Sequence, residues 1–560
     1  MSGATQIERG EYLPLNRPDV LLVLPPLYQT GREPDYNPKE PMGLMYLAAS
    51  LRREGRRVEI FDADIEANTL EQTTQRILEK NPPLVGFSVL QRALPSLEIT
   101  VNALRERGYT GHITCGGITA TLSFPYIMER LGGKINSIVL GEGEKTIVRL
   151  TEKVLTGQDW RTTPAIAYLE NHTQVVNKPI DNVDLDALPF ASRDYLEYCL
   201  GKTNYATIMG SRGCYGICSF CSNYSFENFR DGPRWIGRNP TSVVDEMQEI
   251  FETHNVNVFK FNDPNIFGPG PKGRQHVTQI CQEIKRRRLP FHLMGFCRGN
   301  DITGDPQIVK NLKAAGFERL LIGVESTDDK VLKKFCKGET IGQMEEALNI
   351  LEKEGISVVV GFMIFNPYTT LDTLKSDLAF LRKRGYCPTL SKALRVFDGT
   401  PIQTLLEAEA RLIKRNPFEG YHEYIMPKDM AAIYASMKSL FTNCLDRIRA
   451  VGQERIWDIK KAPSFRDRQD FNSLAEAFFG VESFLLENLI KWTETGDFGL
   501  DNVRETVKEV YEMLRGIGKA ISVDIDEVVS PQETVVSDIH TLMKEKPWNT
   551  FREEYRWNLD

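Results

Sequence analysis

Three cysteines stand on one short segment, Ser211-Arg-Gly-Cys-Tyr-Gly-Ile-Cys-Ser-Phe-Cys221. The spacing Cys-x3-Cys-x2-Cys supplies three thiolates from a single loop. Three thiolates can hold three irons of a cubic [4Fe–4S] cluster and leave the fourth iron open to a further ligand. A structural zinc site is the alternative, but zinc would need a fourth Cys or His at a typical spacing. The nearest downstream candidates, His254 and Cys281, do not lie in such a pair.

This motif resembles the signature of the radical SAM superfamily. The resemblance implies that Cys214, Cys218 and Cys221 ligate the cluster and that Phe220 lies beside it. It also implies that the open iron binds S-adenosylmethionine (SAM), and that the cluster passes one electron to the sulfonium. The protein would then bind, orient and shield these groups. An external electron donor such as a flavodoxin or ferredoxin is expected as a partner.

The residues before this motif alternate strand-length apolar runs with amphipathic helical segments. The run Asp19–Leu24 is continuously apolar after its first residue, which is typical of a parallel strand buried on both faces. Further strands are expected at 58–61, 84–88, 112–115 and 137–140, and helices at 42–54, 69–80 and 96–107. This pattern predicts a doubly wound, Rossmann-like α/β domain over residues 1–160, with its ligand at the carboxyl ends of the strands.

Two further regions follow a hairpin and linker predicted over residues 161–200. A second strand–helix series over 201–412 has expected strands at 206–209, 256–261, 291–295, 319–323, 357–364 and 390–396. Six such units predict a partial (β/α)6 barrel with its site at the carboxyl ends of the strands. Over 413–560 we expect no strands but a helical domain, with helices at 430–448 (Asp429 as N-cap), 471–492 and 503–517.

Small and hydroxyl residues end two neighbouring strands of the first domain. Ser88-Val-Leu90 ends the third strand and Gly116-Gly117 ends the fourth. Glycine lets a backbone approach a ligand closely. Together with Gly141-Glu142, these elements resemble those of cobalamin-binding domains, and the resemblance implies that Ser88, Leu90, Gly116, Gly117, Gly141 and Glu142 contact cobalamin. The alternative is an ordinary doubly wound domain in which Gly-Gly is only a turn.

One departure concerns the cobalt ligand. Cobalamin domains of the mutase and methionine synthase type place Asp-x-His-x-x-Gly before the first helix. The corresponding stretch here, Asn37-Pro-Lys-Glu-Pro-Met-Gly43, contains no histidine, and none of the seven histidines precedes the first helix. We therefore expect a cobalt that has no histidine ligand from the protein.

Several residues at the expected barrel mouth resemble SAM contacts of the superfamily. Gly323-Val-Glu325-Ser326 is similar to a Gly-x-Glu ribose motif, since a carboxylate can accept two hydroxyl hydrogen bonds. The alternative is a glutamate in a surface turn. Phe397-Asp-Gly-Thr-Pro401 resembles the family's Pro-Gly-Thr turn, but Asp398 stands where Pro is usual.

Two further groups are candidates for the amino-acid part of SAM. Arg298 could pair with the SAM carboxylate, and the alternative for this arginine is a structural ion pair. The resemblance places Asn262, Asp263 and Asn265 where the family holds the SAM amino group or the substrate.

The combined pattern is similar to the cobalamin-dependent radical SAM family, chiefly its methyltransferases. This implies transfer of a methyl group from SAM, via methylcobalamin, to an unactivated carbon of a biosynthetic intermediate. No protein nucleophile or general base is then essential. A non-methylating rearrangement or cyclisation is one alternative, and a cobalamin or iron–sulfur sensor or electron-transfer protein is another. We expect the C-terminal domain to set the identity of a small-molecule or natural-product substrate.

Composition and charge exclude several classes of protein. The chain has 560 residues and a formal net charge of −7, which argues against a general nucleic-acid binder. The first residues lack the basic and apolar regions of a signal peptide, and the longest apolar run, at 358–365, is far too short to span a bilayer. We expect a cytoplasmic enzyme without a transmembrane segment.

Overall fold

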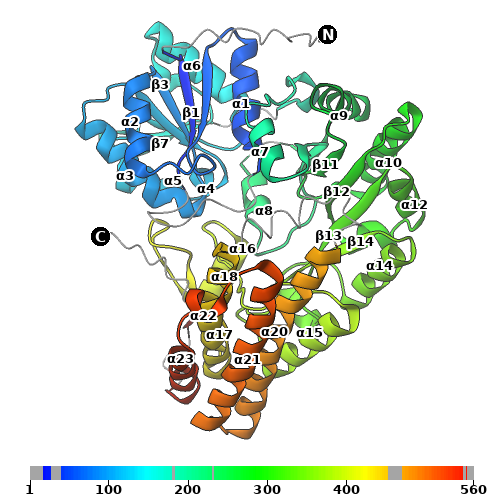
Figure 1. Cartoon of the computed structure of the whole chain (residues 1–560). Helices are drawn as coiled ribbons and strands as arrows, with labels where there is room; N and C mark the ends of the chain where they lie inside the picture. Colours follow the sequence, from blue (N-terminus) through cyan, green and yellow to red (C-terminus); the bar gives the residue numbers. More distant parts are fainter. Residues whose placement is uncertain are drawn as a thin grey trace, which may run out of the picture.

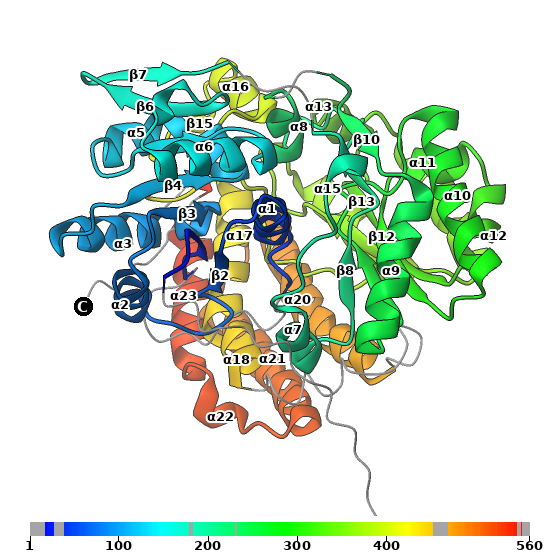
Figure 2. The same cartoon turned by 90° about the horizontal axis from the view of Figure 1, so that it is seen from above.

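The computed structural model describes residues 17–26, 39–178, 183–229, 232–451, 469–545 and 550–551. An N-terminal α/β domain and a half-open β/α barrel lie side by side, and the C-terminal helices lie beneath both (Figures 1 and 2). The short helix α8 (Ser222–Glu227), which directly follows the three cysteines, lies near the centre of this arrangement.

The N-terminal sheet has seven strands in the order β2-β1-β3-β4-β5-β6-β7. Strands β1 to β5 are parallel. Leu21 and Val23 of β1 belong to one hydrophobic core, whereas Val20 and Leu22 belong to a second. The predicted doubly wound domain is therefore confirmed, with apolar side chains on both faces of the sheet.

The bounds of these elements match the predicted segments closely. The strands are β1 (Val20–Leu24), β2 (Val58–Asp62), β3 (Leu84–Ser88), β4 (His112–Gly116), β5 (Ser137–Val139), β6 (Ile166–Glu170) and β7 (Thr173–Val176). The helices are α1 (Met42–Arg53), α2 (Leu70–Lys80), α3 (Leu94–Glu106), α4 (Ile118–Leu122), α5 (Phe124–Leu131) and α6 (Glu144–Thr156). The hairpin β6–β7, expected in a linker, instead extends this sheet, because β6 pairs antiparallel with β5.

The second domain is built on a five-stranded parallel sheet in the order β14-β13-β12-β11-β8. Its strands are β8 (Ala206–Ile208), β11 (Val258–Phe261), β12 (His292–Cys297), β13 (Phe317–Glu325) and β14 (Ser357–Phe362). Its helices are α7 (Leu196–Lys202), α9 (Pro240–His254), α10 (Gly270–Arg287), α11 (Gly299–Thr303), α12 (Gln307–Ala314), α13 (Asp329–Lys334), α14 (Ile341–Lys353), α15 (Leu371–Arg384) and α16 (Pro401–Ala408).

The sixth expected strand, 390–396, does not form a ladder. Leu394 donates one backbone hydrogen bond to Phe365, and single bridges join Ala393 to Phe365 and Val396 to His422. The segment thus changes partner within three residues, so it follows the barrel wall without becoming a regular strand. A separate antiparallel pair, β9 (Ser211–Gly213) and β10 (Trp235–Gly237), brackets the cysteine loop.

The C-terminal region contains the three expected helices and more. They are α17 (Lys428–Leu440), α20 (Gln469–Thr495) and α21 (Leu500–Ile521), joined by α18 (Asp446–Val451), α22 (Ile525–Val528) and α23 (Gln532–Glu545). A π-helical turn, Phe441–Leu445, separates α17 from α18. Asp429 lies in the first turn of α17, and Pro427 occupies the N-cap position predicted for Asp429.

The expectation that no strands follow residue 412 is wrong. Strands β15 (Leu412–Ile413), β16 (Glu423–Ile425) and β17 (Thr550–Phe551) form a small antiparallel sheet. The C-terminal helices also share one continuous hydrophobic core with the barrel helices, so the two regions are packed as one unit. Phe418 from the same region reaches into the core of the N-terminal domain. None of the described helices is both long and apolar enough to cross a bilayer.

Candidate active site

The three cysteines lie on the loop between β9 and α8. Ser219, between the second and third cysteine, fixes this loop. Its N–H donates to the Phe335 carbonyl (2.8 Å), and its carbonyl accepts from the Ile402 N–H (2.8 Å). Its hydroxyl donates to the Lys334 carbonyl (3.1 Å). The loop is therefore tied to the segment after β13 and to the start of α16, at the carboxyl ends of the barrel strands.

The donor set fits an iron–sulfur cluster. Burial raises the pKa of the Cys214 thiol to about 11, so an added metal must displace its proton. The Gly216 N–H points at Cys214 Sγ (3.3 Å), and Arg298 Nη1 points at Cys218 Sγ (3.3 Å). Hydrogen bonds to ligand sulfurs stabilise thiolate charge in such clusters. A side chain at Gly216 would place its Cβ 2.6 Å from Arg298 Nη1, so any larger residue would have to displace the arginine from this position.

The cysteine side chains do not converge on one point. Among the described residues, no three His, Cys, Asp or Glu side chains are grouped to hold a single metal ion. This is compatible with a cubic cluster, because each thiolate then binds a different iron. Phe220 packs its ring edge-on against Phe335, with centroids 5.3 Å apart, and so supports the loop from the side.

A buried network of charges that the sequence did not reveal surrounds Arg298. Arg298 forms an ion pair with Glu339 (3.0 Å) and donates to the Lys337 carbonyl. The Lys337 ammonium lies 3.7 Å from both Glu325 and Glu339. Arg298 therefore makes the structural ion pair that was the alternative for it. Its Nε has no hydrogen-bond partner in the described part of the chain, and contact with the SAM carboxylate stays a prediction.

Glu325 ends β13 in an unusual backbone conformation. Its φ is +70°, a region that residues other than glycine rarely adopt, and the register with β14 shifts at this point. Burial raises the pKa of its carboxyl group, and Lys337 opposes that shift. Strain of this kind clusters at functional sites, which supports the predicted ribose contact. Ser326 is buried, and its hydroxyl accepts the Asp328 N–H (3.2 Å) at the start of α13.

Two of the three polar residues after β11 are already engaged. Asp263 accepts from the Gly210 N–H (3.0 Å) and from the Ser211 hydroxyl (2.5 Å), directly before the cysteine loop. Asn265 donates to Asp301 (2.9 Å), and Asp301 also accepts from the Tyr215 hydroxyl (2.6 Å) within the loop. These contacts position the loop.

Asn262 differs from both neighbours because its side chain is exposed. It is thus the member of this group best placed to reach a ligand, and a SAM contact for all three residues stays a prediction.

The N-terminal domain presents the expected small residues at one edge. Ser88 and Gly116 are paired at the ends of β3 and β4. Gly117 has φ +97°, and a Cβ there would lie 3.7 Å from Ser88 Oγ. Leu90 leaves 45% of its surface exposed, unlike the apolar residues beneath it. The four residues therefore form one edge at the carboxyl ends of the strands, as a ligand of a doubly wound sheet requires.

The Gly-Glu-Gly-Glu segment has a contact that the sequence did not suggest. Gly141 takes φ +69° and donates its N–H to Thr121 (3.0 Å). Glu142 and Glu144 both pair with Arg212, at 3.3 Å and 2.5 Å. Because Arg212 lies two residues before Cys214, this cluster of charges joins the ligand edge of the first domain to the cysteine loop. Any cobalamin contact of Gly141 and Glu142 stays a prediction.

The edge and the cysteine loop also meet through helices. Helix α4, which follows Gly117, packs against α8, which follows Cys221 (Figure 1).

Comparison with known proteins identifies the two domains that meet at this contact. Residues 36–151 match the model of the B12 binding domain, and residues 208–381 match that of the radical SAM superfamily.

The chain belongs to the cobalamin-dependent radical SAM enzymes.

Individual relatives of this family are distant in sequence. The chain is 26% identical over 393 residues to the anaerobic magnesium-protoporphyrin IX monomethyl ester cyclase of Synechocystis sp., covering 69% of this chain and 74% of the relative. It is 26% identical over 371 residues to an uncharacterized methyltransferase of Pyrococcus horikoshii, covering 65% and 78%. The structure of the cobalamin-dependent radical enzyme OxsB with aqua-cobalamin superposes with a TM-score of 0.70 at 18% identity, over 95% of this chain and 84% of that one.

The cofactors of this cobalamin-dependent radical SAM enzyme are a [4Fe–4S] cluster, SAM and cobalamin. No histidine stands in the loops that follow β1, β3, β4 and β5. His112 begins β4, at the opposite end of the strands from the ligand edge. These positions support the prediction that the N-terminal domain gives cobalt no histidine ligand.

Asp398, the residue that departs from the family turn, joins three parts of the enzyme. Its carboxylate accepts from the Ser123 hydroxyl (2.7 Å) of the cobalamin domain and from His422 Nε2 (2.7 Å) of the C-terminal region. His422 Nδ1 accepts the Arg415 N–H (3.1 Å), so the proton of this imidazole lies on Nε2. Both ring nitrogens are thus occupied, and His422 is not free to ligate cobalt.

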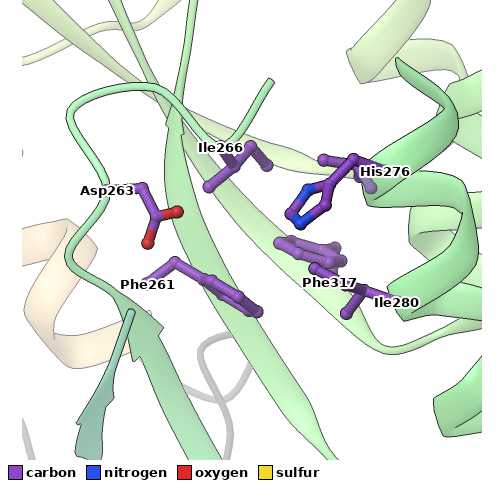
Figure 3. A pocket seen from close by; sticks show the side chains of 7 residues that line it. Phe261, Asp263, Ile266, His276, Ile280 and Phe317 are labelled. Carbon is purple, nitrogen blue, oxygen red and sulfur yellow. The ribbon is translucent and has the colours of Figure 1, made fainter. Parts of the chain in front are cut away.

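A small cavity lies on the other side of the barrel sheet. It is lined by Phe261, Asp263, Ile266, His276, Val277, Ile280 and Phe317, and its volume is about 10 Å³ (Figure 3). Such a volume holds about one water molecule. Phe261 and Phe317 face the helices, so this cavity lies outside the barrel lumen and is not the substrate site.

Proposed function

We propose that this enzyme transfers a methyl group from SAM, by way of cobalamin, to an unactivated carbon of a small biosynthetic intermediate. The observation that carries the proposal is the ion-paired contact of Arg212 with Glu142 and Glu144. It joins the edge that would hold cobalamin to the loop that would hold the cluster. One substrate placed between them could meet both cofactors.

The residues described here have binding and positioning roles in this proposal. The cluster supplies one electron to the sulfonium of SAM, and cobalamin carries the methyl group. Cys214, Cys218 and Cys221 would hold the cluster, while Arg298 and the Gly216 N–H stabilise thiolate charge. Glu325 would hold the SAM ribose, and Ser88, Gly116 and Gly117 would accommodate cobalamin. An external flavodoxin or ferredoxin would supply the electron.

Relatives support two outcomes for the substrate. The Pyrococcus horikoshii relative is named a methyltransferase, which favours methyl transfer. The Synechocystis relative is named a cyclase, which favours a second candidate function, ring formation without methyl transfer. Both outcomes use the same cofactors and begin with the same cleavage of SAM.

The products of SAM distinguish these candidates. The anaerobically purified enzyme, with its iron and cobalamin contents measured, would be incubated with a reductant, methyl-labelled SAM and fractionated metabolite extracts. Methyl transfer predicts S-adenosylhomocysteine and 5′-deoxyadenosine in equal amounts, with label in a new product. Formation of 5′-deoxyadenosine alone, dependent on one fraction, would replace methyl transfer by ring formation or rearrangement. If no fraction changed SAM consumption, a sensor or electron-transfer role would be favoured.

A further inference from the structure

The inner face of the barrel sheet carries a partly buried lysine, Lys260. Lys260 lies on β11, directly paired with Met294 on β12. Its neighbours Phe259 and Phe261 point the other way, into the core beneath the helices. Since successive residues of a strand point to opposite faces, the Lys260 side chain lies on the face turned away from the helices. No carboxylate of the described residues forms an ion pair with it.

A second cation lies on the same face of the sheet as Lys260, and a third comes from the cobalamin domain. Arg319 on β13 pairs with Met294 and therefore lies on the same face, two strands and about 10 Å away. Lys39 belongs to the loop before α1 of the cobalamin domain, and it is close enough to disfavour the charge of Lys260. The neighbouring ion pair of Glu40 with Arg193 holds that loop against β8 through the Thr207 N–H. The barrel and the cobalamin domain thus each contribute a cation to the surroundings of Lys260.

The surroundings of Lys260 only partly compensate its charge. Its ammonium lies 5.7 Å from the ring centre of Tyr205 and 5.6 Å from that of Phe296. A cation beside an aromatic ring gains about 0.5–2 kcal/mol. Burial, with the repulsion from Lys39, nevertheless lowers the pKa of Lys260 to about 8. The net effect is a partly buried ammonium whose charge costs free energy, which is typical of a functional site.

We infer that Lys260, with Arg319 and Lys39, forms a subsite for an oxyanion, a carboxylate or phosphate group carried by the substrate. This inference rests on the proposed function, because it names a feature of the substrate of that reaction. The SAM carboxylate is the other possible source of an oxyanion. Arg319 lies six residues before Glu325 on β13, about 20 Å along the strand. This distance separates the proposed oxyanion subsite from the predicted ribose contact.

The test uses inorganic phosphate as the probe and the melting temperature of the cofactor-loaded enzyme as the readout. Lys260→Met removes the charge but keeps the shape, and Lys260→Arg keeps the charge. Lys285→Met, at an exposed position near the end of α10, is the matched control. All four proteins would be titrated with phosphate at constant ionic strength.

The subsite predicts opposite effects on stability and on binding. Without phosphate, Lys260→Met should melt above the unaltered protein at pH 7, because a costly charge is gone. Its apparent phosphate Kd should rise about tenfold or more, whereas Lys260→Arg and Lys285→Met should respond like the unaltered protein. An unchanged phosphate response in Lys260→Met would overturn the inference.

A SAM-binding measurement on the same variants separates the two sources of the anion. Unchanged SAM affinity in Lys260→Met supports a substrate oxyanion, whereas a matching loss of SAM affinity would overturn that assignment in favour of the SAM carboxylate. These readouts do not depend on product formation. If methyl transfer failed while phosphate still bound at Lys260, the proposed reaction would be wrong and the subsite would stand.

Discussion

Arg212 Nη2 lies 2.5 Å from Glu144 Oε1, and this contact links the two cofactor domains. Burial alone would lower the pKa of Arg212, but Glu144 and Glu142 raise it above its ordinary value. The arginine therefore stays charged, and its position between the domains fixes the cysteine loop relative to the cobalamin edge. Glu142, expected to contact cobalamin, contributes to this junction through its carboxylate.

Replacing Arg212 by Gln should weaken this junction. Removing one partner of a buried ion pair costs about 3–5 kcal/mol, because the remaining carboxylates stay buried without a counter-ion. We expect a lower melting temperature and SAM cleavage that is no longer matched by product. Arg286→Gln, which removes an exposed ion pair with Glu283, should leave the melting temperature nearly unchanged, because solvent screens such a pair. If Arg212→Gln melted at the wild-type temperature and formed one product for each SAM cleaved, the contact would have no positioning role.

Cys214→Ala should abolish the cluster. The substitution leaves two thiolates on the loop, too few to hold three irons of a cube. Iron content, the visible absorption of the reduced and oxidised protein, and 5′-deoxyadenosine formation should all fall to background. Cys336→Ala is the control, because this exposed cysteine follows α13 and should not affect iron content. A full complement of iron with normal SAM cleavage in Cys214→Ala would refute the assignment.

His112 gives the cobalamin domain a predictable acid sensitivity. Burial lowers the pKa of this imidazole to about 3, and its Nε2 lies 2.9 Å from the Ser137 hydroxyl. Between pH 6.5 and 3 the unfolded chain therefore binds a proton that the folded chain does not. Stability present above pH 6.5 is lost as the pH falls, by about 1.4 kcal/mol per pH unit from this group.

His112→Gln should remove that dependence. As the pH falls from 7.5 to 5, the melting temperature of the wild type should drop faster than that of the variant. His172→Gln, at the exposed turn between β6 and β7, should keep the wild-type dependence. Parallel curves for His112→Gln and the wild type would mean that another group controls the acid sensitivity.

Periodicity located most of the strands and helices, because those elements bury apolar residues at regular spacing. Periodicity did not predict the strands correctly where the backbone hydrogen-bond partners do not follow a regular ladder. The segment 390–396 is apolar enough for a strand, but its backbone has several unrelated partners, so no ladder forms. The N–H groups of Leu390 and Ser391 donate to the Glu482 carboxylate, Leu394 donates to Phe365, and Val396 forms a bridge with His422. Strands β15 and β16 are very short, and β17, which pairs with β16, comes from the far end of the chain, so no local pattern marks this sheet.

In the candidate active site too, the sequence predicted local motifs but not contacts between residues that are distant in the chain. The cysteine spacing is local, so the sequence alone identified the loop. The role of Asp398 depends on Ser123, 275 residues earlier, and on His422, and no local pattern reports such contacts. Lys337 and Glu339 were missed for the same reason, since their partners Glu325 and Arg298 are brought to them only by the fold.

Glu325→Gln tests the SAM site most directly. Glutamine keeps the size of the side chain but replaces one of the two carboxylate oxygens that would accept the ribose hydroxyls. Hydrogen bonds to a charged group contribute about 1.5–3 kcal/mol each, so the loss should be measurable. We expect the SAM Kd to rise about tenfold or more while cobalamin binding stays unchanged. Glu318→Gln is the control, because Glu318 lies on the same strand but pairs with His292. The variant should also keep the strained backbone at φ +70°, so a loss of SAM affinity with an unaltered melting temperature would assign the effect to the carboxylate rather than to the turn. Unchanged SAM affinity would reduce Glu325 to a partner of Lys337 in the buried network around Arg298.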